Sequence, residues 1–397
     1  MRILLALTYY RPHVSGLTIY VQRIAEELAA GNHQVTVVTS RYSKSLPRSE
    51  VMNGVRVVRV PVAARISKGI VAPATVKVAA PLVREHDVVA VNLPSTPGEA
   101  IILPLLARWQ GRPVTATYHC DIKLPPGAIN RLVDASVRSI NFLCGGLVDG
   151  IVAYTTDYAD HTPFLQRYRA KCHVIPPPVA MPSPDAARVS DFRKEHIADG
   201  GLLIGFAARF AAEKGVEFML RALPGIHREY PHARVLFAGE YQNVVGEQGH
   251  WRRMQPALEA AGSHWRFLGV LEPAEMATFF AACDVTVLPS INSTESFGLV
   301  QVESMLCGTP VVAADLPGVR VPVRTTGMGR IVPPADSTAL AEAVCEVIRN
   351  RSLYLRPRGM VEAHYSTSAT VESYLDLFQR LLKHRAGGGF NDRGDKR

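Results

Sequence analysis

The sequence predicts an α/β protein with two tandem Rossmann-like, doubly wound domains that face each other across a cleft. At 397 residues, the chain exceeds the size at which a single hydrophobic core stops growing, so two domains are expected. Apolar, strand-like runs alternate with longer segments of helical periodicity in both halves, as is typical of parallel sheets covered by helices. A proline-rich stretch from Pro176 to Pro184 interrupts this alternation, and we expect the interdomain linker there.

Residues 1–178 are expected to form the N-terminal domain. Its predicted strands are Arg2–Leu7, Gln34–Thr39, Val55–Val60, Asp87–Val91, Pro113–Tyr118, Gly150–Ala153 and His173–Ile175. Its predicted helices are Thr18–Ala30, Gly98–Gln110, Asn130–Leu147 and Tyr158–Tyr168.

Residues 179–366 are expected to form the C-terminal domain. Its predicted strands are Leu202–Ala207, Ala233–Ala238, Trp265–Leu268, Asp284–Leu288, Pro310–Ala313 and Gly329–Val332. Its predicted helices are Gly215–Glu229, Pro273–Ala282, Phe297–Cys307 and Ser337–Asn350. A last helix over 367–384 is expected to pack back toward the N-terminal domain, and the Gly-rich, charged tail 385–397 to be flexible.

The composition favours a soluble protein of the cytoplasm. No stretch reaches the roughly 18 consecutive apolar residues that a membrane-spanning helix needs. The apolar run Ile3–Thr8 at the N-terminus is too short for a signal peptide. The six cysteines show no CxxC and no clustering, so neither a zinc site nor a disulfide framework is indicated.

The positive charge lies in the first half of the chain. Residues 1–180 carry 20 Lys/Arg against 11 Asp/Glu, and residues 181–397 carry 24 of each, so the first half accounts for the whole formal charge of +9. Nucleic acid is disfavoured, because the basic residues are not interleaved with aromatic ones. We expect the N-terminal domain to take the acceptor and to dock on an anionic membrane surface or a lipid-phosphate acceptor, the alternative being a merely solubilising surface. The basic segment behind this expectation comprises Arg41, Lys44, Arg48, Arg56, Arg59, Arg65 and Lys68.

Two glutamates eight positions apart, Glu295 and Glu303, mark a candidate site in the second half. They follow the apolar run Asp284–Ser290, so a helix beginning near Phe297 would direct its free N–H groups beyond the end of a strand, where they favour an anion. Carboxylates repel an anionic ligand unless they accept hydrogen bonds from hydroxyl groups of that ligand. Sugars and riboses supply such hydroxyl groups. Taken alone, the pair could equally be solvated charges at a helix start.

Two further loops follow predicted strands and precede predicted helices. The first contains Gly16, where a small residue lets the backbone approach a phosphate. The second contains Arg209 and Lys214, which could hold a diphosphate or simply form an exposed basic loop. No D-x-D occurs in the chain, so we expect these cations, and no metal, to neutralise a diphosphate.

His119 closes the predicted strand Pro113–Tyr118. A lone histidine at a strand end is more often a structural group, although ligands of such sheets bind at this edge.

On these residues the chain resembles the family 4 glycosyltransferases, retaining enzymes of the GT-B architecture, from Met1 to about Leu382. The matching segments are Ile24–Leu28 with Gly31–Thr39, the strand end at His119, R-x4-K-G over 209–215, E-x7-E over 295–303, and Cys307–Val312. The chain departs from the usual pattern at Ser15-Gly16, where Gly-Gly is common, and over 316–324, where a Gly-Gly and a glutamate are commoner.

The resemblance implies a role for each candidate residue. Arg209, Lys214 and the Gly16 loop would bind the donor diphosphate, and Glu303 the ribose. Glu295 and the backbone of Phe297, Gly298 and Leu299 would hold the donor sugar. His119 would lie beside the reacting sugar, and we expect it and Glu295 to be the catalytic residues.

The function that follows is transfer of a hexose-type sugar, with retention, from a UDP- or GDP-sugar to a hydroxyl of a lipid-linked, glycan or small-molecule acceptor, without a required cofactor. Front-face attack and a covalent intermediate both remain open. A sugar-nucleotide epimerase of the same fold and a non-catalytic nucleotide-sugar-binding protein are the alternatives.

Overall fold

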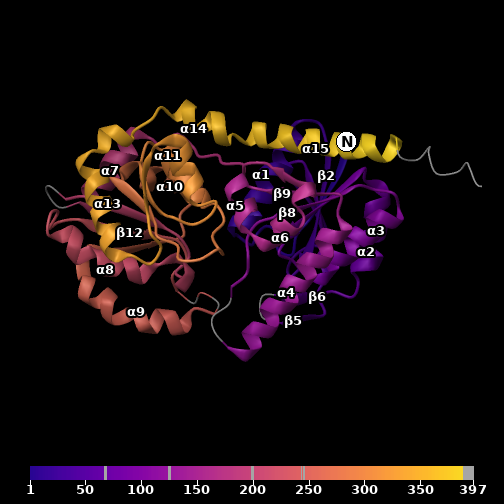
Figure 1. Cartoon of the computed structure of the whole chain (residues 1–397), viewed down its shortest axis with the longest axis horizontal. Coiled ribbons are helices and arrows are strands. Elements are labelled where there is room, and N and C mark those ends of the chain that lie inside the picture. Colours follow the sequence, from indigo (N-terminus) through magenta and orange to yellow (C-terminus); the bar gives the residue numbers. More distant parts are fainter. Residues whose placement is uncertain (67–68, 124–126, 198–200, 243, 245, 388–397) are drawn as a thin grey trace, which may run out of the picture. The chain divides into compact units, whose positions relative to one another are not determined.

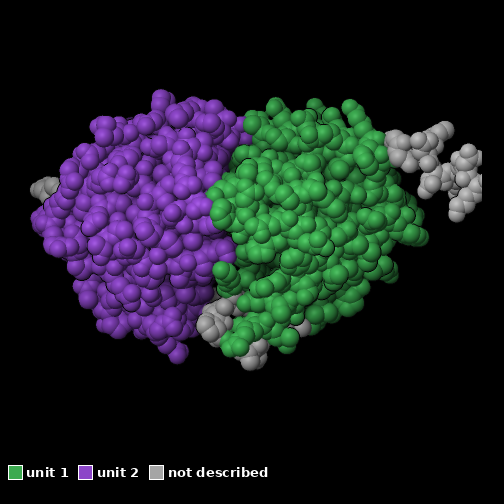
Figure 2. All heavy atoms as spheres, viewed as in Figure 1, with its two compact units in different colours: residues 1–178, 367–397 green, residues 179–366 purple. Residues whose placement is uncertain are grey.

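The computed structural model describes residues 1–66, 69–123, 127–197, 201–242, 244 and 246–387, and in it each half of the chain builds one sheet covered by helices (Figure 1). The chain divides into two compact units (Figure 2). Unit 1 contains residues 1–178 together with the chain from Thr367 onward, and unit 2 contains Val179–Ser366.

The sheet of unit 1 has the strand order β10-β9-β8-β7-β1-β2-β4-β3, and only β3 runs antiparallel to its neighbour. The strands are β1 (Arg2–Ala6), β2 (Gln34–Arg41), β3 (Ser49–Met52), β4 (Val55–Pro61), β7 (Val88–Leu93), β8 (Val114–Tyr118), β9 (Gly150–Ala153) and β10 (Cys172–Val174). A separate hairpin pairs β5 (Ala64–Ile66) with β6 (Gly69–Val71). Because the chain builds outward from β1 first through β2 and then through β7, the order reverses between β1 and β7, which makes this the switch point of the sheet.

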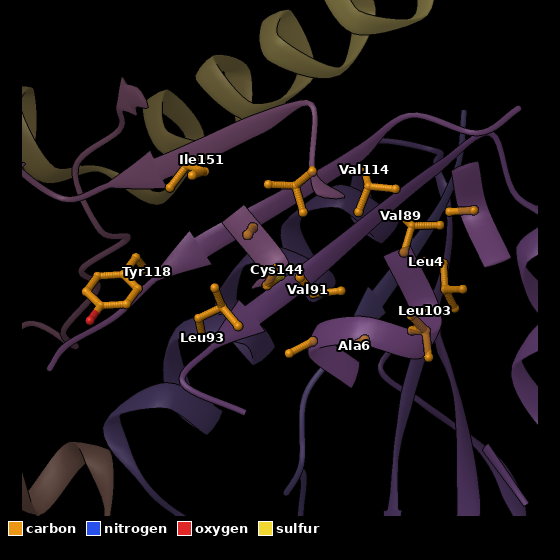
Figure 3. Packing of buried hydrophobic residues seen from close by; sticks show 14 of the residues in the cluster. Leu4, Ala6, Val89, Val91, Leu93, Leu103, Val114, Tyr118, Cys144 and Ile151 are labelled. Carbon is orange, nitrogen blue, oxygen red and sulfur yellow. The ribbon is translucent and has the colours of Figure 1, made fainter. Parts of the chain in front are cut away.

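The helices of unit 1 are α1 (Gly16–Ala30), α2 (Thr75–Glu85), α3 (Leu103–Trp109), α4 (Ala128–Leu147), α5 (Thr156–His161), α6 (Pro163–Arg167) and α15 (Thr367–Gly387). A π-helical turn, η1 (Gly98–Ile102), leads into α3, and a 3-10 turn, η2 (Arg169–Lys171), precedes β10. Every residue of β7 and β8 is buried, as expected for strands covered on both faces. Figure 3 shows the core that results, which contains Val89, Val91 and Leu93 of β7 together with Leu4 of β1, Val114 of β8 and Ile151 of β9.

The sheet of unit 2 has the order β13-β12-β11-β14-β15-β16 and is parallel throughout. Its strands are β11 (Leu203–Ala207), β12 (Arg234–Ala238), β13 (Trp265–Gly269), β14 (Val285–Leu288), β15 (Val311–Ala314) and β16 (Gly329–Val332). Its helices are α7 (Ala186–His196), α8 (Val216–His227), α9 (Gln248–Ala261), α10 (Pro273–Ala282), α11 (Leu299–Leu306), α12 (Arg320–Thr326), α13 (Ser337–Arg349) and α14 (Arg358–Tyr365), with 3-10 turns η3 (Ala212–Lys214), η4 (Gly262–His264) and η5 (Arg351–Tyr354). Here the strand order reverses between β11 and β14.

The sequence predictions hold for the fold class and for most elements of the two sheets. They miss several elements whose patterns are weak: α2 contains Pro81 and α9 contains Pro256, and β3, β5 and β6 are short. The single helix expected over Tyr158–Tyr168 is two helices, because Pro163 begins α6 and ends the run of α5.

The C-terminal helix α15 packs on α1 of unit 1, as the sequence predicts (Figure 1). The buried hydroxyl of Tyr374 lies 2.7 Å from the hydroxyls of both Tyr20 on α1 and Thr117 on β8. The helix continues to Gly387, and Arg385 pairs with Asp149 at 2.9 Å, so the flexible tail does not begin at residue 385. Residues 388–397 of the predicted tail lie outside the described residues.

We expect Tyr374→Phe to lower the free energy of unfolding by about 1–3 kcal/mol, because the buried hydroxyls of Tyr20 and Thr117 would each lose a partner. Denaturant unfolding measures this loss. Tyr42→Phe is the control, since Tyr42 is only half-buried and its change should stay within about 0.5 kcal/mol. Equal stability of the two variants would contradict the assignment.

Candidate functional site

The loops that follow β11 and β14 meet at the switch point of unit 2. The backbone N–H of Ile291 donates to the carbonyl of Glu213 at 3.0 Å, which joins the two loops directly. Gly215 has a φ of +74°, and a Cβ on it would lie 2.0 Å from the carbonyl oxygen of Pro289. Only glycine fits this approach, so the loop that carries Arg209 and Lys214 is held against the loop that carries Glu295.

Lys214 and Glu295 form an ion pair across this switch point. Lys214 Nζ lies 2.6 Å from Glu295 Oε2, and the two side chains are 19% and 15% exposed. The hydroxyl of Ser290 lies 3.5 Å from the same carboxylate oxygen. The pair therefore brings together one residue predicted to bind the diphosphate and one predicted to bind the sugar.

Arg209 lies on the same loop as Lys214. Its Nη2 lies 2.8 Å from Glu213 Oε1, and its side chain is 41% exposed. A half-exposed guanidinium with one carboxylate partner retains N–H groups for a second anion. The loop thus presents two cations, each already beside a carboxylate.

Helix α11 begins at Leu299, two residues later than predicted, because Gly298 takes a φ of +75° and caps it. A Cβ on Gly298 would lie 2.2 Å from Leu288 Cδ2. Among the described residues, none accepts a hydrogen bond from the backbone N–H of Leu299 or Val300. These N–H groups lie beyond the carboxyl end of β14 and favour an anion.

The structure also places Phe297, Glu303 and the segment 316–324 of unit 2. The ring of Phe297 is buried against Tyr365, with centroids 5.6 Å apart, so a ligand can meet this residue only at its backbone. Glu303 is partly exposed in the middle of α11. Over 316–324, where the chain departs from the family pattern, Arg320 pairs with Asp315 at 3.1 Å.

His119 lies at the carboxyl edge of the sheet of unit 1 and is buried. Its Nε2 lies 2.7 Å from Asn92 Oδ1, and its Nδ1 contacts the hydroxyl of Tyr154. Because Asn92 Nδ2 donates to the carbonyl of Ala6, the amide oxygen faces the ring, and Nε2 must carry the proton. Burial lowers the pKa of His119 to about 3, so the imidazole is neutral at physiological pH.

Gly16 is the first residue of α1 and is exposed. Ser15 caps this helix, accepting from the N–H of Thr18 at 3.2 Å. A Cβ on Gly16 would meet nothing within 4 Å, so its backbone is open to approach from outside. His119 and Gly16 belong to unit 1, whereas the other predicted site residues belong to unit 2.

Glu99, which the sequence analysis did not single out, is a buried carboxylate at the switch point of unit 1. Its Oε2 accepts from the hydroxyl of Thr8 at 2.6 Å and from the N–H of Thr96 at 3.4 Å. Burial raises the pKa of Glu99 to about 7, and these bonds lower it less. The available signal was an acidic residue shortly after a mostly apolar strand and its proline-containing turn, but Glu99 fell inside a predicted helix.

Two family models match the chain and together cover most of it. The glycosyl transferase 4-like domain matches residues 15–178, and the glycosyl transferases group 1 model matches residues 188–362. The chain belongs to the family 4 glycosyltransferases. Of the functions that the sequence left open, glycosyl transfer is therefore the one that holds, and the protein is an enzyme.

Individual relatives agree with this assignment. The chain is 26% identical to a phosphatidyl-myo-inositol mannosyltransferase of Mycolicibacterium smegmatis over 89% of this chain and 86% of that protein. It is 28% identical to a 2-deoxystreptamine N-acetyl-D-glucosaminyltransferase of Streptomyces fradiae over 95% and 93%. With the corresponding mannosyltransferase of Mycobacterium leprae, the identity is 32%, but over only 46% of this chain and 47% of that one.

Solved structures share the fold. A sucrose-phosphate synthase from Thermosynechococcus elongatus superposes with a TM-score of 0.76 and 21% identity over 96% of this chain and 99% of that one. The Anabaena protein HepE in complex with UDP-glucose gives a TM-score of 0.77 and 18% identity over 96% and 100%. Within the described residues, no helix is long and apolar enough to span a membrane.

We expect Glu99→Gln to change how stability depends on pH. Between the ordinary pKa of 4.5 and the raised pKa of about 7, the folded protein keeps a proton that the unfolded chain releases, so the contribution of Glu99 to stability falls as the pH rises through this window. A glutamine carries no such charge, so the variant should gain up to about 3 kcal/mol over the parent above pH 7. Denaturant unfolding from pH 4 to 8 measures this.

Glu85→Gln is the matched control for this change, because Glu85 lies in the same unit with its side chain 55% exposed. Its stability curve should run parallel to that of the parent. A parallel curve for Glu99→Gln as well would show that Glu99 is not buried as a proton-holding acid.

Proposed function

We propose that the enzyme transfers a hexose-type sugar, with retention of configuration, from a UDP- or GDP-sugar to a hydroxyl group of a glycan, lipid-linked or small-molecule acceptor. The observation that carries this proposal is the Lys214–Glu295 pair at the switch point of unit 2, flanked by Arg209 and the open N–H groups of α11. Cations and helix N–H groups suit a diphosphate, and carboxylates suit sugar hydroxyls. HepE, which shares the fold, is bound to UDP-glucose in its structure.

The ion pair suggests how donor binding proceeds. A diphosphate reaching Lys214 replaces Glu295 as its partner, and the freed carboxylate then accepts hydrogen bonds from hydroxyls of the donor sugar. Arg209 supplies a planar fork of N–H donors to the same diphosphate. As the bond between the sugar and the diphosphate breaks, charge develops on the leaving group, and these cations and the start of α11 stabilise it.

The other residues take supporting roles in this proposal. Glu303 binds the ribose hydroxyls and the Gly16 backbone approaches the diphosphate. Neutral His119 donates from Nε2 when the sugar reacts, exchanging Asn92 for a sugar oxygen. The cations take the place of a metal, so the enzyme works without a divalent ion.

On the acceptor side, we propose that unit 1 binds the acceptor and docks on an anionic membrane at the cytoplasmic face. The relatives named for phosphatidyl-myo-inositol support a lipid acceptor. Not every residue of the basic segment serves this surface: the side chain of Arg59 is fully buried and pairs with Glu50 at 2.5 Å. Lys44 and Arg48 are exposed. Lys68 lies outside the described residues.

We expect Arg209→Lys and Lys214→Ala to weaken nucleotide binding at least tenfold, because lysine lacks the bidentate fork and alanine lacks the charge. Thermal shifts with UDP, GDP and ADP measure this, since a ligand at 100 times its Kd adds about 2.7 kcal/mol to the stability of the parent. EDTA should leave turnover unchanged.

Matched controls exist for both donor-site variants. Arg221 forms the same i,i+4 pair with Glu217 elsewhere in unit 2, and Lys194 pairs with Asp191 on its surface. Arg221→Lys and Lys194→Ala should bind nucleotide as the parent does. Unchanged nucleotide binding in both site variants would reject the donor site, and a loss of activity in EDTA that Mg²⁺ restores would reject metal independence.

We expect the parent enzyme to cosediment with vesicles containing anionic lipid, less so as salt increases, and not with neutral vesicles. Each basic residue near an anionic bilayer contributes about 1 kcal/mol, so the double change of Lys44 and Arg48 to alanine should weaken binding by roughly 30-fold. The same change of Lys194 and Arg221 in unit 2 is the control. No binding to anionic vesicles at low salt would exclude membrane docking.

A further inference from the structure

Gln301 is a fully buried amide in the first turn of α11. It is the third residue of that helix and is 0% exposed. Its Nε2 donates to the carbonyl oxygen of Val319 at 2.9 Å and also to the carbonyl oxygen of Phe297. Carbonyl oxygens only accept hydrogen bonds, so the NH2 end of the amide must face both of them. Both N–H groups of this amide are therefore used.

The two carbonyl groups belong to different segments at one edge of the sheet. Phe297 lies in the loop after β14, and Val319 lies in the segment between β15 and α12. Strands β14 and β15 are parallel neighbours. Their carboxyl ends therefore meet at the same edge, where sheets of this kind bind their ligands. Gln301 thus joins the loop that carries Glu295 to the segment that follows the next strand.

The other end of the amide has no hydrogen-bond partner among the described residues. Its Oε1 is shielded from solvent, and no described group donates to it. A buried acceptor without a donor is costly, and an apolar side chain of the same length would avoid this cost. The amide therefore does not serve its own end of the pair: what it contributes is the two hydrogen bonds that it donates to the backbone.

The backbone that Gln301 holds is the start of α11 itself. Gly298 takes a φ of +75°, and no side chain caps the helix there. The backbone N–H of Gln301 donates to the carbonyl of Gly298 at 3.1 Å, next to the side-chain bond to Phe297. The N–H groups of Leu299 and Val300 lie within the turn that these two bonds close. A shift of Gln301 would therefore change where those N–H groups point.

We propose that Gln301 is a positioning residue for the donor. Its amide holds the carbonyl groups of Phe297 and Val319 at a fixed separation, which keeps the N–H groups of Leu299 and Val300 directed at the donor. Gln301 itself does not touch the donor, because it is buried with both its side-chain N–H groups engaged. This inference rests on the proposed function, since it concerns how that enzyme binds its donor.

The test replaces Gln301 by methionine, which keeps the length of the side chain but has no N–H group. Calorimetric titration with UDP and with GDP gives the Kd. Hydrolysis of UDP-glucose and of GDP-mannose without acceptor gives kcat and the donor KM. Gln301→Met should raise the Kd and the donor KM at least tenfold, because a shift of about 1 Å in groups that position a substrate can cost roughly 100-fold.

Thr309→Val is the matched control. The hydroxyl of Thr309 is equally buried and donates to the carbonyl of Phe280 at 2.7 Å. These two residues precede β15 and β14, so their bond lies at the opposite edge of the same sheet. The control should lose stability in denaturant, as Gln301→Met does, but keep the Kd and the donor KM of the parent.

The donor KM separates a positioning role from a structural one. A variant that is merely less stable has fewer folded molecules, which lowers the apparent kcat and leaves the KM unchanged. A Kd and donor KM of Gln301→Met equal to those of the parent would overturn the proposal. So would an equal rise in Thr309→Val, because the effect would then belong to any buried hydrogen bond of this sheet.

Two further cases are covered. If Gln301→Met does not fold, Gln301→Leu takes its place with the same expected result, and a donor KM equal to that of the parent again counts against the proposal. If the parent binds neither UDP nor GDP and hydrolyses neither nucleotide sugar, the proposed function fails and this inference fails with it. If the parent binds nucleotide and the Gln301 variant binds it equally well, only this inference fails.

Discussion

The contact between the Gly215 backbone and the carbonyl oxygen of Pro289 is the constraint on which the proposed donor site depends. Side chains on two loops can hold one ligand only if the loops keep a fixed distance. Here that distance is set by backbone atoms, because a Cβ at residue 215 would lie 2.0 Å from the oxygen. The N–H of Ile291 reinforces the contact through its bond to Glu213. These two contacts flank Lys214 on its own loop and hold it near Glu295, whose Oε2 lies 2.6 Å from Lys214 Nζ.

The two units have similar sheet topologies, but the charges of the side chains at the reversal of strand order differ. Each sheet reverses its strand order once, and in each a side chain from one loop reaches a side chain from the other across the reversal. In unit 2 the two side chains are a lysine and a glutamate, so charge is balanced and can be exchanged for that of an anionic ligand. In unit 1 they are Thr8 and Glu99; among the described residues no cation pairs with this carboxyl group, and burial raises its pKa. The charges at the reversal of unit 2 therefore suit an anionic ligand.

Buried hydrogen bonds hold His119 in place at the carboxyl edge of the sheet of unit 1. His119 is oriented by Asn92 and Tyr154, and its ring packs edge-on against Tyr20 at 4.9 Å. Tyr20 in turn shares its hydroxyl with Tyr374 of the C-terminal helix. Residues from opposite ends of the chain thus hold one imidazole in place. A deletion of α15 would therefore remove a helix that helps to position His119.

The sequence by itself determined the architecture and indicated the residues that we propose for the donor site. Apolar periodicity is a local property, so it located most strands and helices, and the spacing of Arg209 to Gly215 and of Glu295 to Glu303 is readable within single loops. Tertiary structure decided what local patterns do not encode: that Lys214 and Glu295 are each other's partners, that Gly298 delays the start of α11, and that Arg59 of the basic segment is buried. It also decided that Glu99 is a buried acid, since an ordinary pKa becomes a raised one only when distant strands remove the water around it. Residue types and their spacing are properties of the sequence, whereas the burial of a side chain and the partners of a charge depend on contacts between residues that are far apart in the sequence.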